Sequence, residues 1–209
     1  MAREVVLASG NSGKIREIKE MLADLGVSVL PQSRFGIKEA EETACTFVEN
    51  ALIKARHAAA WTKRPALADD SGLEVDALDG APGVHSAYYA GRRASDRENM
   101  EKLLWDLSHV PEAQRTARFH CVMVFLRHPE DPTPLICHGI WEGRILFETK
   151  GTKGFGYDPV FYVPTHGCSA AELPPEVKNH LSHRGQALRK LRRTLHMCCA
   201  AIGLRGEFS

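Results

Sequence analysis

The N-terminal segment has the pattern of a strand, a turn, a helix and a second strand, and this order restricts the possible folds. Glu4–Ala8 is short, apolar and β-branched, which is typical of a buried strand. Small residues follow in Ser9–Lys14, apolar residues then recur at helical spacing over Ile15–Leu25, and Gly26 is expected to end this helix. Val27–Leu30 has the pattern of another strand. A strand, a helix and a strand in this order predict an α/β layer.

Capping boxes, in which a Ser or Thr N-cap pairs with a following Glu, mark further elements. Thr46–Glu49 opens an alanine-rich helix that we expect to reach about Lys63. Ser95–Glu98 opens a helix that we expect to end near Leu107. Ser169–Glu172 has the same pattern.

Strand patterns occupy the middle of the chain. Pro65–Ala68 and Leu73–Val75 read as two short strands separated by Asp69–Gly72. Arg118–Arg127 and Leu135–Leu146 are β-rich runs joined by a proline-rich loop, which predicts a long antiparallel hairpin. A hairpin lobe flanked by α/β elements would leave a cleft between two lobes, where ligands commonly bind.

The C-terminal segment 182–201 predicts a helix, because Leu188, Leu191 and Leu195 lie on one apolar stripe. We expect the residues after Leu195 to complete this helix and then to be disordered. Together the elements predict a single domain over residues 1–209, with two lobes.

Charge and cysteine usage exclude several classes of protein. The 209 residues include 27 Lys and Arg against 26 Asp and Glu, with a formal net charge of +1. We therefore expect no nucleic acid polymer as partner. The longest apolar runs, such as Cys121–Leu126, are far short of the ~20 residues that span a bilayer, so we expect no membrane association. Six cysteines without C-x-x-C spacing favour a reduced, cytoplasmic protein over a disulfide-linked one.

The turn Ser9–Lys14 places small residues and a lysine at the start of a helix. Backbone N–H groups and the positive end of the helix dipole favour an anion there, and Lys14 adds a full charge. The turn is not a P-loop, because only two residues separate Gly10 from Gly13, and Ile15 stands where a magnesium-binding Ser or Thr belongs. A phosphate site and a tight turn with an exposed lysine both remain open.

Asp69–Gly72 follows an apolar strand. Neighbouring side chains of a strand face opposite ways, so one of Asp69 and Asp70 should face a site and the other should face away. A carboxylate at the mouth of an α/β sheet suits a hard metal ion or an activated water. With an unperturbed pKa of ~3.9, such an aspartate would be ionised at neutral pH but a weak base. Asp, Ser and Gly are also typical of a plain turn.

Two further segments can contribute to a nucleotide site. The acids of Glu39–Thr43 can supply oxygen ligands for Mg²⁺ if the chain brings them to Asp70, and otherwise form a solvated loop. Gly154–Pro159 places two glycines around Phe155, which exposes a ring face for stacking of a base. The alternative for this segment is a glycine-rich bend around a core Phe.

Lys178 and the cluster Ser182–Arg184 form a basic segment near the start of a helix. Arg and Lys donate hydrogen bonds and do not accept them. Against a purine they therefore match a 6-keto oxygen and mismatch a 6-amino group. The alternative is a basic cluster on the surface of a helix.

Five motifs occur in a particular order: S-G-N-S-G-K, the A-E-E-T loop, A-D-D-S-G-L with G-A-P-G-V-H-S-A, G-F-G-Y-D-P, and S-H-R-G-Q-A-L. From about Val5 to Leu195 the chain resembles the inosine triphosphate pyrophosphatase family, in its bacterial dITP/XTP type. The resemblance implies an elongated, two-lobed mixed α/β fold with a central cleft. It also implies hydrolysis of ITP, dITP and XTP to the monophosphate and pyrophosphate, by Mg²⁺-assisted attack of water on the α-phosphorus. Such an activity removes non-standard purines from the nucleotide pool.

The resemblance further implies a homodimer and roles for particular residues. Asp70 would accept a proton from water and bind Mg²⁺, with Glu41 as a second metal ligand. Residues from Ser9 to Lys14 would hold the triphosphate, and the later motifs would form the base pocket. The substrate-binding residues implied in this way are Ser9, Gly10, Asn11, Ser12, Gly13, Lys14, Ser71, Phe155, Gly156, Tyr157, Asp158, Lys178, His183 and Arg184.

Two other functions are compatible with some of these residues. A pyrophosphatase for modified pyrimidine or methylated nucleotides would have a similar fold and a different pocket. A non-catalytic nucleotide sensor would need only a phosphate turn and a base pocket. The combination of Lys14, Glu41 and Asp70 argues against the sensor, because a binder gains nothing from a water-activating carboxylate beside a polyanion.

Overall fold

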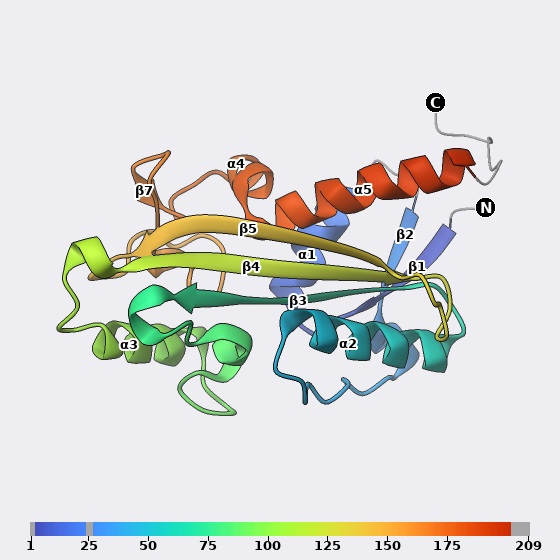
Figure 1. Cartoon of the computed structure of the whole chain (residues 1–209), viewed down its shortest axis with the longest axis horizontal. Helices are drawn as coiled ribbons and strands as arrows, with labels where there is room; N and C mark the ends of the chain where they lie inside the picture. Colours follow the sequence, from blue (N-terminus) through green and yellow to red (C-terminus); the bar gives the residue numbers. More distant parts are fainter. Residues whose placement is uncertain (1–2, 24–26, 202–209) are drawn as a thin grey trace. The chain divides into compact units, whose positions relative to one another are not determined.

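A computed structural model describes residues 3–23 and 27–201 of the chain (Figure 1). The chain divides into two compact units. Unit 1 comprises residues 1–70, 122–138 and 184–209, and unit 2 comprises residues 71–121 and 139–183. Residues 202–209, for which the sequence predicts disorder, lie outside the described residues. Within the described ranges, no helix is both long enough and apolar enough to cross a membrane.

The strands form one mixed sheet in the order β2-β1-β3-β4-β5-β6-β7. β1 pairs in parallel with β2 and with β3, whereas the pairs β5–β6 and β6–β7 are antiparallel. The bounds are β1 (Arg3–Ala8), β2 (Val27–Pro31), β3 (Ala66–Val75), β4 (Thr116–Leu126), β5 (Leu135–Ile145), β6 (Phe161–Val163) and β7 (Cys168–Ser169). The parallel β1–β2 pair with a helix between its strands confirms the predicted α/β layer.

The helices are α1 (Ser12–Leu22), α2 (Phe47–Thr62), α3 (Asp96–Asp106), α4 (Pro175–Leu181) and α5 (His183–Ala201). The structure confirms the predicted helices as α1, α2, α3 and α5, and it adds α4, which was not predicted. However, α1 is assigned only to Leu22 rather than to the predicted end at Leu25, which lies outside the described residues. Short 3₁₀ turns lie at Gln32–Phe35, Asp76–Leu78, Gly83–Tyr88, Glu112–Gln114 and Asp158–Val160. Thr46 caps α2 by accepting a hydrogen bond from Glu49 N, and Ser95 and Glu98 form the complete capping box of α3.

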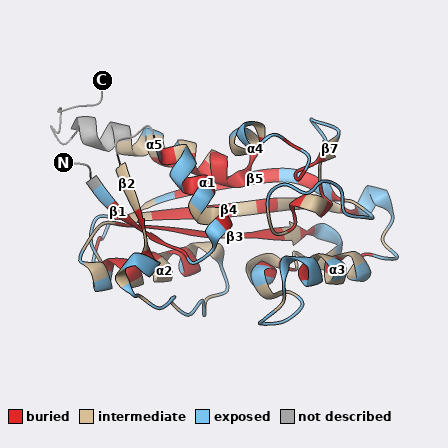
Figure 2. Cartoon of the chain, turned by 180° about the vertical axis from the view of Figure 1, so that it is seen from behind, coloured by how far each residue is buried: buried red, intermediate tan, exposed pale blue. Residues whose placement is uncertain are grey.

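One cluster in the core of unit 1 is rich in small side chains. Ala51, Ala55 and Ala58 lie on one face of α2 and are fully buried in a cluster with Val6 and Val124. Methyl groups at helical spacing allow the helix to approach the strands closely. Figure 2 shows buried residues along the strands and largely exposed residues in the loop that precedes α2.

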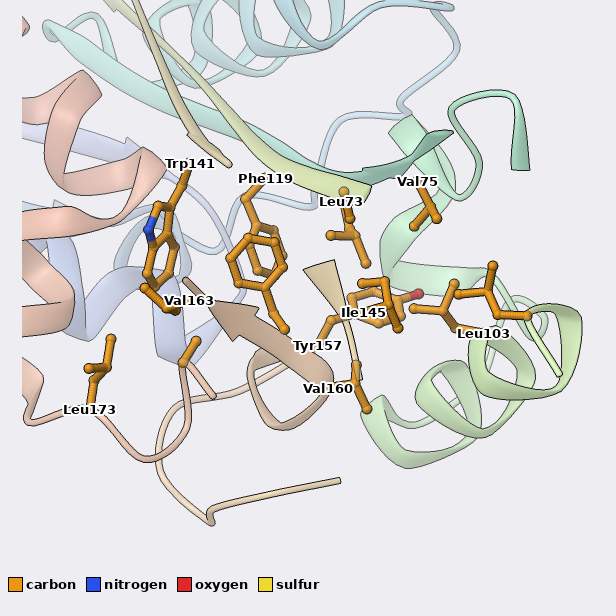
Figure 3. Close-up of a cluster of buried hydrophobic side chains, with 14 residues drawn as sticks. Leu73, Val75, Leu103, Phe119, Trp141, Ile145, Tyr157, Val160, Val163 and Leu173 are labelled. Atoms are coloured by element: carbon orange, nitrogen blue, oxygen red, sulfur yellow. The ribbon is translucent and has the colours of Figure 1, made fainter. Parts of the chain in front are cut away.

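The core of unit 2 is built from large aromatic side chains (Figure 3). The ring of Phe119 lies 4.5 Å from that of Phe161 and 6.3 Å from that of Trp141, between ring centroids. Leu73 and Leu103 are fully buried in the same cluster. Aromatic pairs at these separations add to the stability that burial alone provides.

Two predictions about individual segments differ from the structure. β3 is one continuous strand over Ala66–Val75, so Asp69–Gly72 is not a turn between two strands. Ser169–Glu172 does form a capping bond, from Ser169 N to Glu172 Oε2 at 2.7 Å, but it closes a turn and α4 begins only at Pro175. In both segments the contacts of the folded chain override a local preference. The predicted hairpin is confirmed, because β4 and β5 are neighbours joined by the loop 127–134 (Figure 1).

Candidate active site

The phosphate turn, residues Ser9–Lys14, connects the end of β1 to α1. Asn11 is the N-cap of α1, and its Oδ1 accepts a hydrogen bond from Lys14 N at 3.0 Å. Asn11 N in turn donates to Ser9 Oγ at 3.2 Å. A Cβ at Gly10 would overlap the carboxylate of Glu39, so only glycine permits this close approach. The helix therefore begins earlier than predicted and places Lys14 in its first turn.

Asp69 is a fully buried carboxylate with cations on both oxygens. Oδ1 lies 2.7 Å from Lys14 Nζ, and Oδ2 lies 2.8 Å from Arg184 Nε. Arg184 Nη1 also lies 2.6 Å from Glu17 Oε2. Burial opposes ionisation of Asp69, but the charges of Arg184 and Lys14 outweigh it and hold its pKa well below the usual range. Asp69 is thus an anion that fixes Lys14 and Arg184.

Asp70 lies next in the strand and has different partners. Its Oδ1 accepts a hydrogen bond from Lys54 Nζ at 2.5 Å, and Lys54 belongs to α2 rather than to α1 or α5. The two aspartates thus pair with different helices, as the alternation of side chains along a strand predicts. Oδ2 of Asp70 is buried and has no hydrogen-bond partner among the described residues.

Burial raises the pKa of Asp70 to about 6, and the nearby charges of Lys54 and Lys14 offset this effect only in part. The pKa of Lys54 is also raised, because attraction to Asp70 and Glu42 outweighs its burial. Asp70 is therefore ionised at neutral pH but binds a proton more readily than an ordinary aspartate. Burial thus makes Asp70 a somewhat stronger base than the unperturbed aspartate that the sequence suggests.

The acidic loop does approach Asp70, through Lys54. Glu42 Oε1 lies 3.2 Å from Lys54 Nζ, so Glu42 and Asp70 share one ammonium group. Glu41, the predicted metal ligand, is exposed in the same loop, and its ligand role stays a prediction. The structure therefore brings Glu39 and Glu42 of this segment to the predicted site residues.

Sequence reasoning missed Lys54 and Glu17, although each carries a signal. Lys54 lies one turn from Ala51 and Ala58 on the buried stripe of α2, and its side chain is only 11% exposed. Glu17 lies with Ile18 on the buried side of α1. A charged residue on an otherwise apolar stripe needs a buried partner of opposite charge, and each of these has one.

The carboxylate oxygens around Asp70 show whether Mg²⁺ fits this site. Among the residues that the structure describes, no group of three or more His, Cys, Asp or Glu side chains is placed to hold a metal ion. Mg²⁺ usually needs only one or two carboxylates, with substrate phosphates and water completing its shell. The unpartnered Oδ2 of Asp70, near the acidic loop, supplies such a ligand. The donor set therefore fits Mg²⁺ bound together with a triphosphate.

In unit 2, the segment Gly154–Pro159 is held by an ion pair. Lys178 Nζ lies 2.5 Å from Asp158 Oδ2 and 5.0 Å from the centre of the half-buried Phe155 ring. Asp158 Oδ2 also accepts a hydrogen bond from Phe155 N at 2.9 Å. Gly154 has a φ of +77°, and a Cβ there would overlap the Asp158 carboxylate. Lys178, Asp158 and Phe155 thus form one cluster, as the predicted base pocket requires.

The other predicted base-pocket residues have mixed surroundings. Tyr157 lies in the core of unit 2, where its hydroxyl donates to Ser86 O at 2.9 Å. Gly156 N donates to Asp96 Oδ2 at 2.7 Å, which ties the segment to the start of α3. The ring of His183 is buried and stacks on Phe119, with centroids 4.7 Å apart. Contact of these residues with a substrate stays a prediction, as it does for the half-buried Ser71.

Comparison with known proteins gives consistent matches over almost the whole chain. The model of the Ham1 family matches residues 5–194. A protein of Vibrio parahaemolyticus named dITP/XTP pyrophosphatase is 61% identical over 189 residues, which cover 90% of this chain and 94% of the relative. A protein of Vibrio cholerae with the same name is 58% identical over the same share of this chain and of the relative.

Two solved structures have the same fold. The structure of a HAM1 protein from Coxiella burnetii has a TM-score of 0.87 and 54% identity, and the match covers 93% of this chain and 99% of that one. The Ham1 protein of Staphylococcus aureus has a TM-score of 0.82 and 41% identity, with 93% of this chain and 98% of that chain covered.

Proposed function

Because the chain belongs to the Ham1 family, we propose that it hydrolyses the non-standard purine nucleoside triphosphates ITP, dITP and XTP to the monophosphate and pyrophosphate. The observation that carries this proposal is the environment of Asp70. A buried carboxylate with a raised pKa and an unpartnered oxygen lies in the same cluster as the lysine of the phosphate turn. Relatives that match most of the chain are named dITP/XTP pyrophosphatases.

Asp70 would act as the general base that takes a proton from the attacking water. A base with a pKa of about 6 is ionised at neutral pH and still accepts a proton more readily than an unperturbed aspartate. Lys54 holds Oδ1 and leaves Oδ2 without a partner among the described residues, so Oδ2 is the atom that would orient the water.

The lysines would counter the charge that develops on the leaving pyrophosphate. Lys14 lies at the start of α1, where the helix dipole also favours an anion. Departure of pyrophosphate requires that water attack the α-phosphorus, since attack on the γ-phosphorus would release inorganic phosphate. The α-phosphorus must then lie next to Asp70, and the β- and γ-phosphates next to the phosphate turn.

The charge of the cluster supports a requirement for Mg²⁺. The side chains that form it carry three positive and four negative charges: Lys14, Lys54 and Arg184 against Glu17, Glu42, Asp69 and Asp70. A triphosphate with roughly four negative charges would be repelled by this net charge. Bound Mg²⁺ would supply the missing positive charge, with Asp70 and the predicted Glu41 as its protein ligands.

Base selection would rest on hydrogen-bond donors. Lys178 and Arg184 donate and do not accept, so they match the 6-keto group of inosine and xanthine and reject the 6-amino group of adenine. Phe155 would stack on the base, because its ring is half-buried and lies under the ammonium of Lys178. Guanine also has a 6-keto group, so a further contact must exclude its 2-amino group.

We also propose that the enzyme acts as a homodimer in the cytoplasm. The cytoplasmic location rests on the six cysteines of the sequence, which lack C-x-x-C spacing and so favour a reducing compartment. The dimer follows from the family resemblance, and sedimentation of the purified protein tests it.

The proposed reaction is tested by identifying the products of ITP and ATP, each with Mg²⁺ and with EDTA. We expect IMP and pyrophosphate from ITP, much less product from ATP, and no turnover in EDTA. Release of IDP and inorganic phosphate would move the attack to the γ-phosphorus and contradict the mechanism. Tight ITP binding without turnover would favour a nucleotide sensor. Turnover of modified pyrimidine or methylated nucleotides in preference to ITP would overturn the substrate class.

A further inference from the structure

Asp69 contacts two cations to which the proposed function gives different tasks in nucleotide recognition. Lys14, on Oδ1, belongs to the phosphate turn. Arg184, on Oδ2, belongs to the segment that we expect to read the base. The proposed reaction gives Asp69 itself no chemical step, since Asp70 is the base. A carboxylate shared between the two recognition elements therefore calls for its own explanation.

The surroundings of Asp69 make its two bonds rigid. The side chains of Asp69 and Arg184 are 0% and 2% exposed, so water cannot readily replace either partner. Glu17 holds the far side of the guanidinium at 2.6 Å and lies about one helical turn from Lys14 in α1. Lys14, Asp69, Arg184 and Glu17 thus form a ring that α1 closes. In such a dry network, the position of each charge depends on its neighbours.

We propose that Asp69 is a positioning residue that couples the phosphate-binding Lys14 to the base-reading Arg184, an inference that rests on the proposed function. Asp69 fixes the ammonium of Lys14 with one oxygen and the plane of the Arg184 guanidinium with the other. Loss of either bond lets the carboxylate move and so displaces the remaining cation. Base discrimination and the phosphate contact are therefore linked through one side chain, and such linkage acts in both directions.

The variant Asp69→Asn tests this coupling, because an amide has one acceptor oxygen and one donor group and cannot accept from both cations. We expect two losses in the same protein. The ratio of kcat/KM for ITP to that for ATP falls at least tenfold, because Arg184 is displaced. The kcat for ITP also falls at least tenfold, because Lys14 is displaced.

Glu17→Gln separates the two losses. This change weakens the hold on Arg184 and leaves the bond between Lys14 and Asp69 in place. We expect the ITP-to-ATP ratio to fall at least threefold, and kcat for ITP to fall clearly less than in Asp69→Asn. If Asp69→Asn lowers kcat no more than Glu17→Gln does, Asp69 positions only the arginine and the coupling is wrong.

Asp131→Asn is the matched control for a merely structural effect. Asp131 is 2% exposed, belongs to unit 1 and forms an ion pair with Arg127, outside the proposed site. We expect it to lower the melting temperature and to leave both the ITP-to-ATP ratio and kcat within twofold of wild type. Loss of selectivity in Asp131→Asn as large as in Asp69→Asn would assign the effect to general destabilisation and overturn the proposal.

Lys14→Met keeps the inference testable if Asp69→Asn does not fold. Lys14 lies in the phosphate turn, so its effect on base choice must pass through Asp69. We expect the ITP-to-ATP ratio to fall at least threefold, and a ratio within twofold of wild type would overturn the coupling. A wild-type enzyme without preference for ITP would instead overturn the proposed function itself. If the wild-type enzyme prefers ITP and Asp69→Asn keeps the ITP-to-ATP ratio within twofold of wild type, the coupling is wrong and the proposed function stands.

Discussion

Two buried arginines, one in each unit, donate their hydrogen bonds to different kinds of acceptor. Arg184 in unit 1 lies between the carboxylates of Asp69 and Glu17. Arg115 in unit 2 donates hydrogen bonds to backbone carbonyls, at 2.7 Å to Leu107, 2.9 Å to Ile145 and 2.8 Å to Leu146. Both side chains are nearly inaccessible to water.

The difference separates a functional role from a structural one. The carbonyls come from two segments, Leu107 after α3 and Ile145 with Leu146 at the end of β5, so Arg115 links the end of α3 to the end of β5. Carboxylates instead keep Arg184 charged beside other ionised groups, in the site that we propose for the nucleotide. Changes around the carboxylates should therefore alter catalysis or selectivity, whereas changes at Arg115 should alter stability.

The largest effect should follow a change in the charged cluster of unit 1. Asp70→Asn keeps the volume of the side chain but removes the group that accepts the proton, so we expect kcat for ITP to fall by about 10²–10⁴-fold. The rate is measured with saturating Mg²⁺. The melting temperature should not fall, because burial already disfavours the charged form of Asp70. A rate within threefold of wild type would exclude Asp70 as the base.

Arg115→Met should have the opposite effect to Asp70→Asn: it should lower stability and leave substrate selectivity unchanged. It removes the guanidinium donors of the Ile145 and Leu146 carbonyls, at about 1–3 kcal/mol each. The Leu107 carbonyl, in contrast, still accepts from Val110 N. We therefore expect a loss of about 2–5 kcal/mol in the free energy of unfolding by urea. The folded fraction should keep its preference for ITP over ATP.

Arg118→Met, three residues further along the chain in β4, is the control, because Arg118 pairs with Asp76 and Glu142 at the surface, where ion pairs contribute about 0–1 kcal/mol. Equal losses in the two variants would contradict the role of Arg115.

Phe155→Ala tests the aromatic end of the site in unit 2. Loss of stacking costs about 1–3 kcal/mol per base, which raises KM roughly 5–150-fold. Because every base has a face that can stack, KM should rise for ITP and ATP alike, and their ratio should change little. Trp105→Ala removes a more exposed aromatic residue of the same unit and should leave KM unchanged. A selective effect on ITP would mean that Phe155 reads the edge of the base.

The smallest effect should come from Asp131, whose charge contributes to stability away from the site. The side-chain hydrogen bond with Arg127 holds the pKa of Asp131 well below its usual range. A depressed pKa stabilises the folded protein above the unfolded value of ~3.9, and this stabilisation disappears as pH falls through the folded value. Asp131→Asn should therefore cost about 1–2 kcal/mol at pH 7 and progressively less below pH ~4. Urea unfolding of the wild type and the variant, at pH 7 and below pH ~4, measures this cost. An equal loss of unfolding free energy in both ranges would contradict the prediction.

Local patterns were sufficient for much of the fold. The N-caps Thr46 and Ser95 are recognised within four residues of sequence, and α2 and α3 begin where these residues predict. The strand β3 was not predictable as one element, because Asp, Ser and Gly at 69–72 favour turns. Their continuation as a strand depends on partners such as Arg184, which lies 115 residues further along the chain.

The sequence predicted which residues form the candidate site better than it predicted which of them form ion pairs. Strand alternation indicates that Asp69 and Asp70 face opposite ways, but the helices that supply Lys14 and Lys54 decide which aspartate is flanked by two cations. The raised pKa of Asp70 could not be predicted, because burial is a property of the folded chain. Arg184 was predicted as a base donor, and the structure adds that two carboxylates already hold it.

The unbroken course of β3 limits how this protein can change in length. Asp69 and Asp70 are adjacent members of one charged cluster, yet each pairs directly with a different lysine. Inserting or deleting one residue within Ala66–Ala68 would move every following side chain to the other face of the strand. The aspartates would then exchange surroundings, and both pairs would be lost at once. Substitutions in this strand can therefore be tolerated, but single-residue insertions and deletions cannot. Length differences between this chain and its relatives should be confined to the loops.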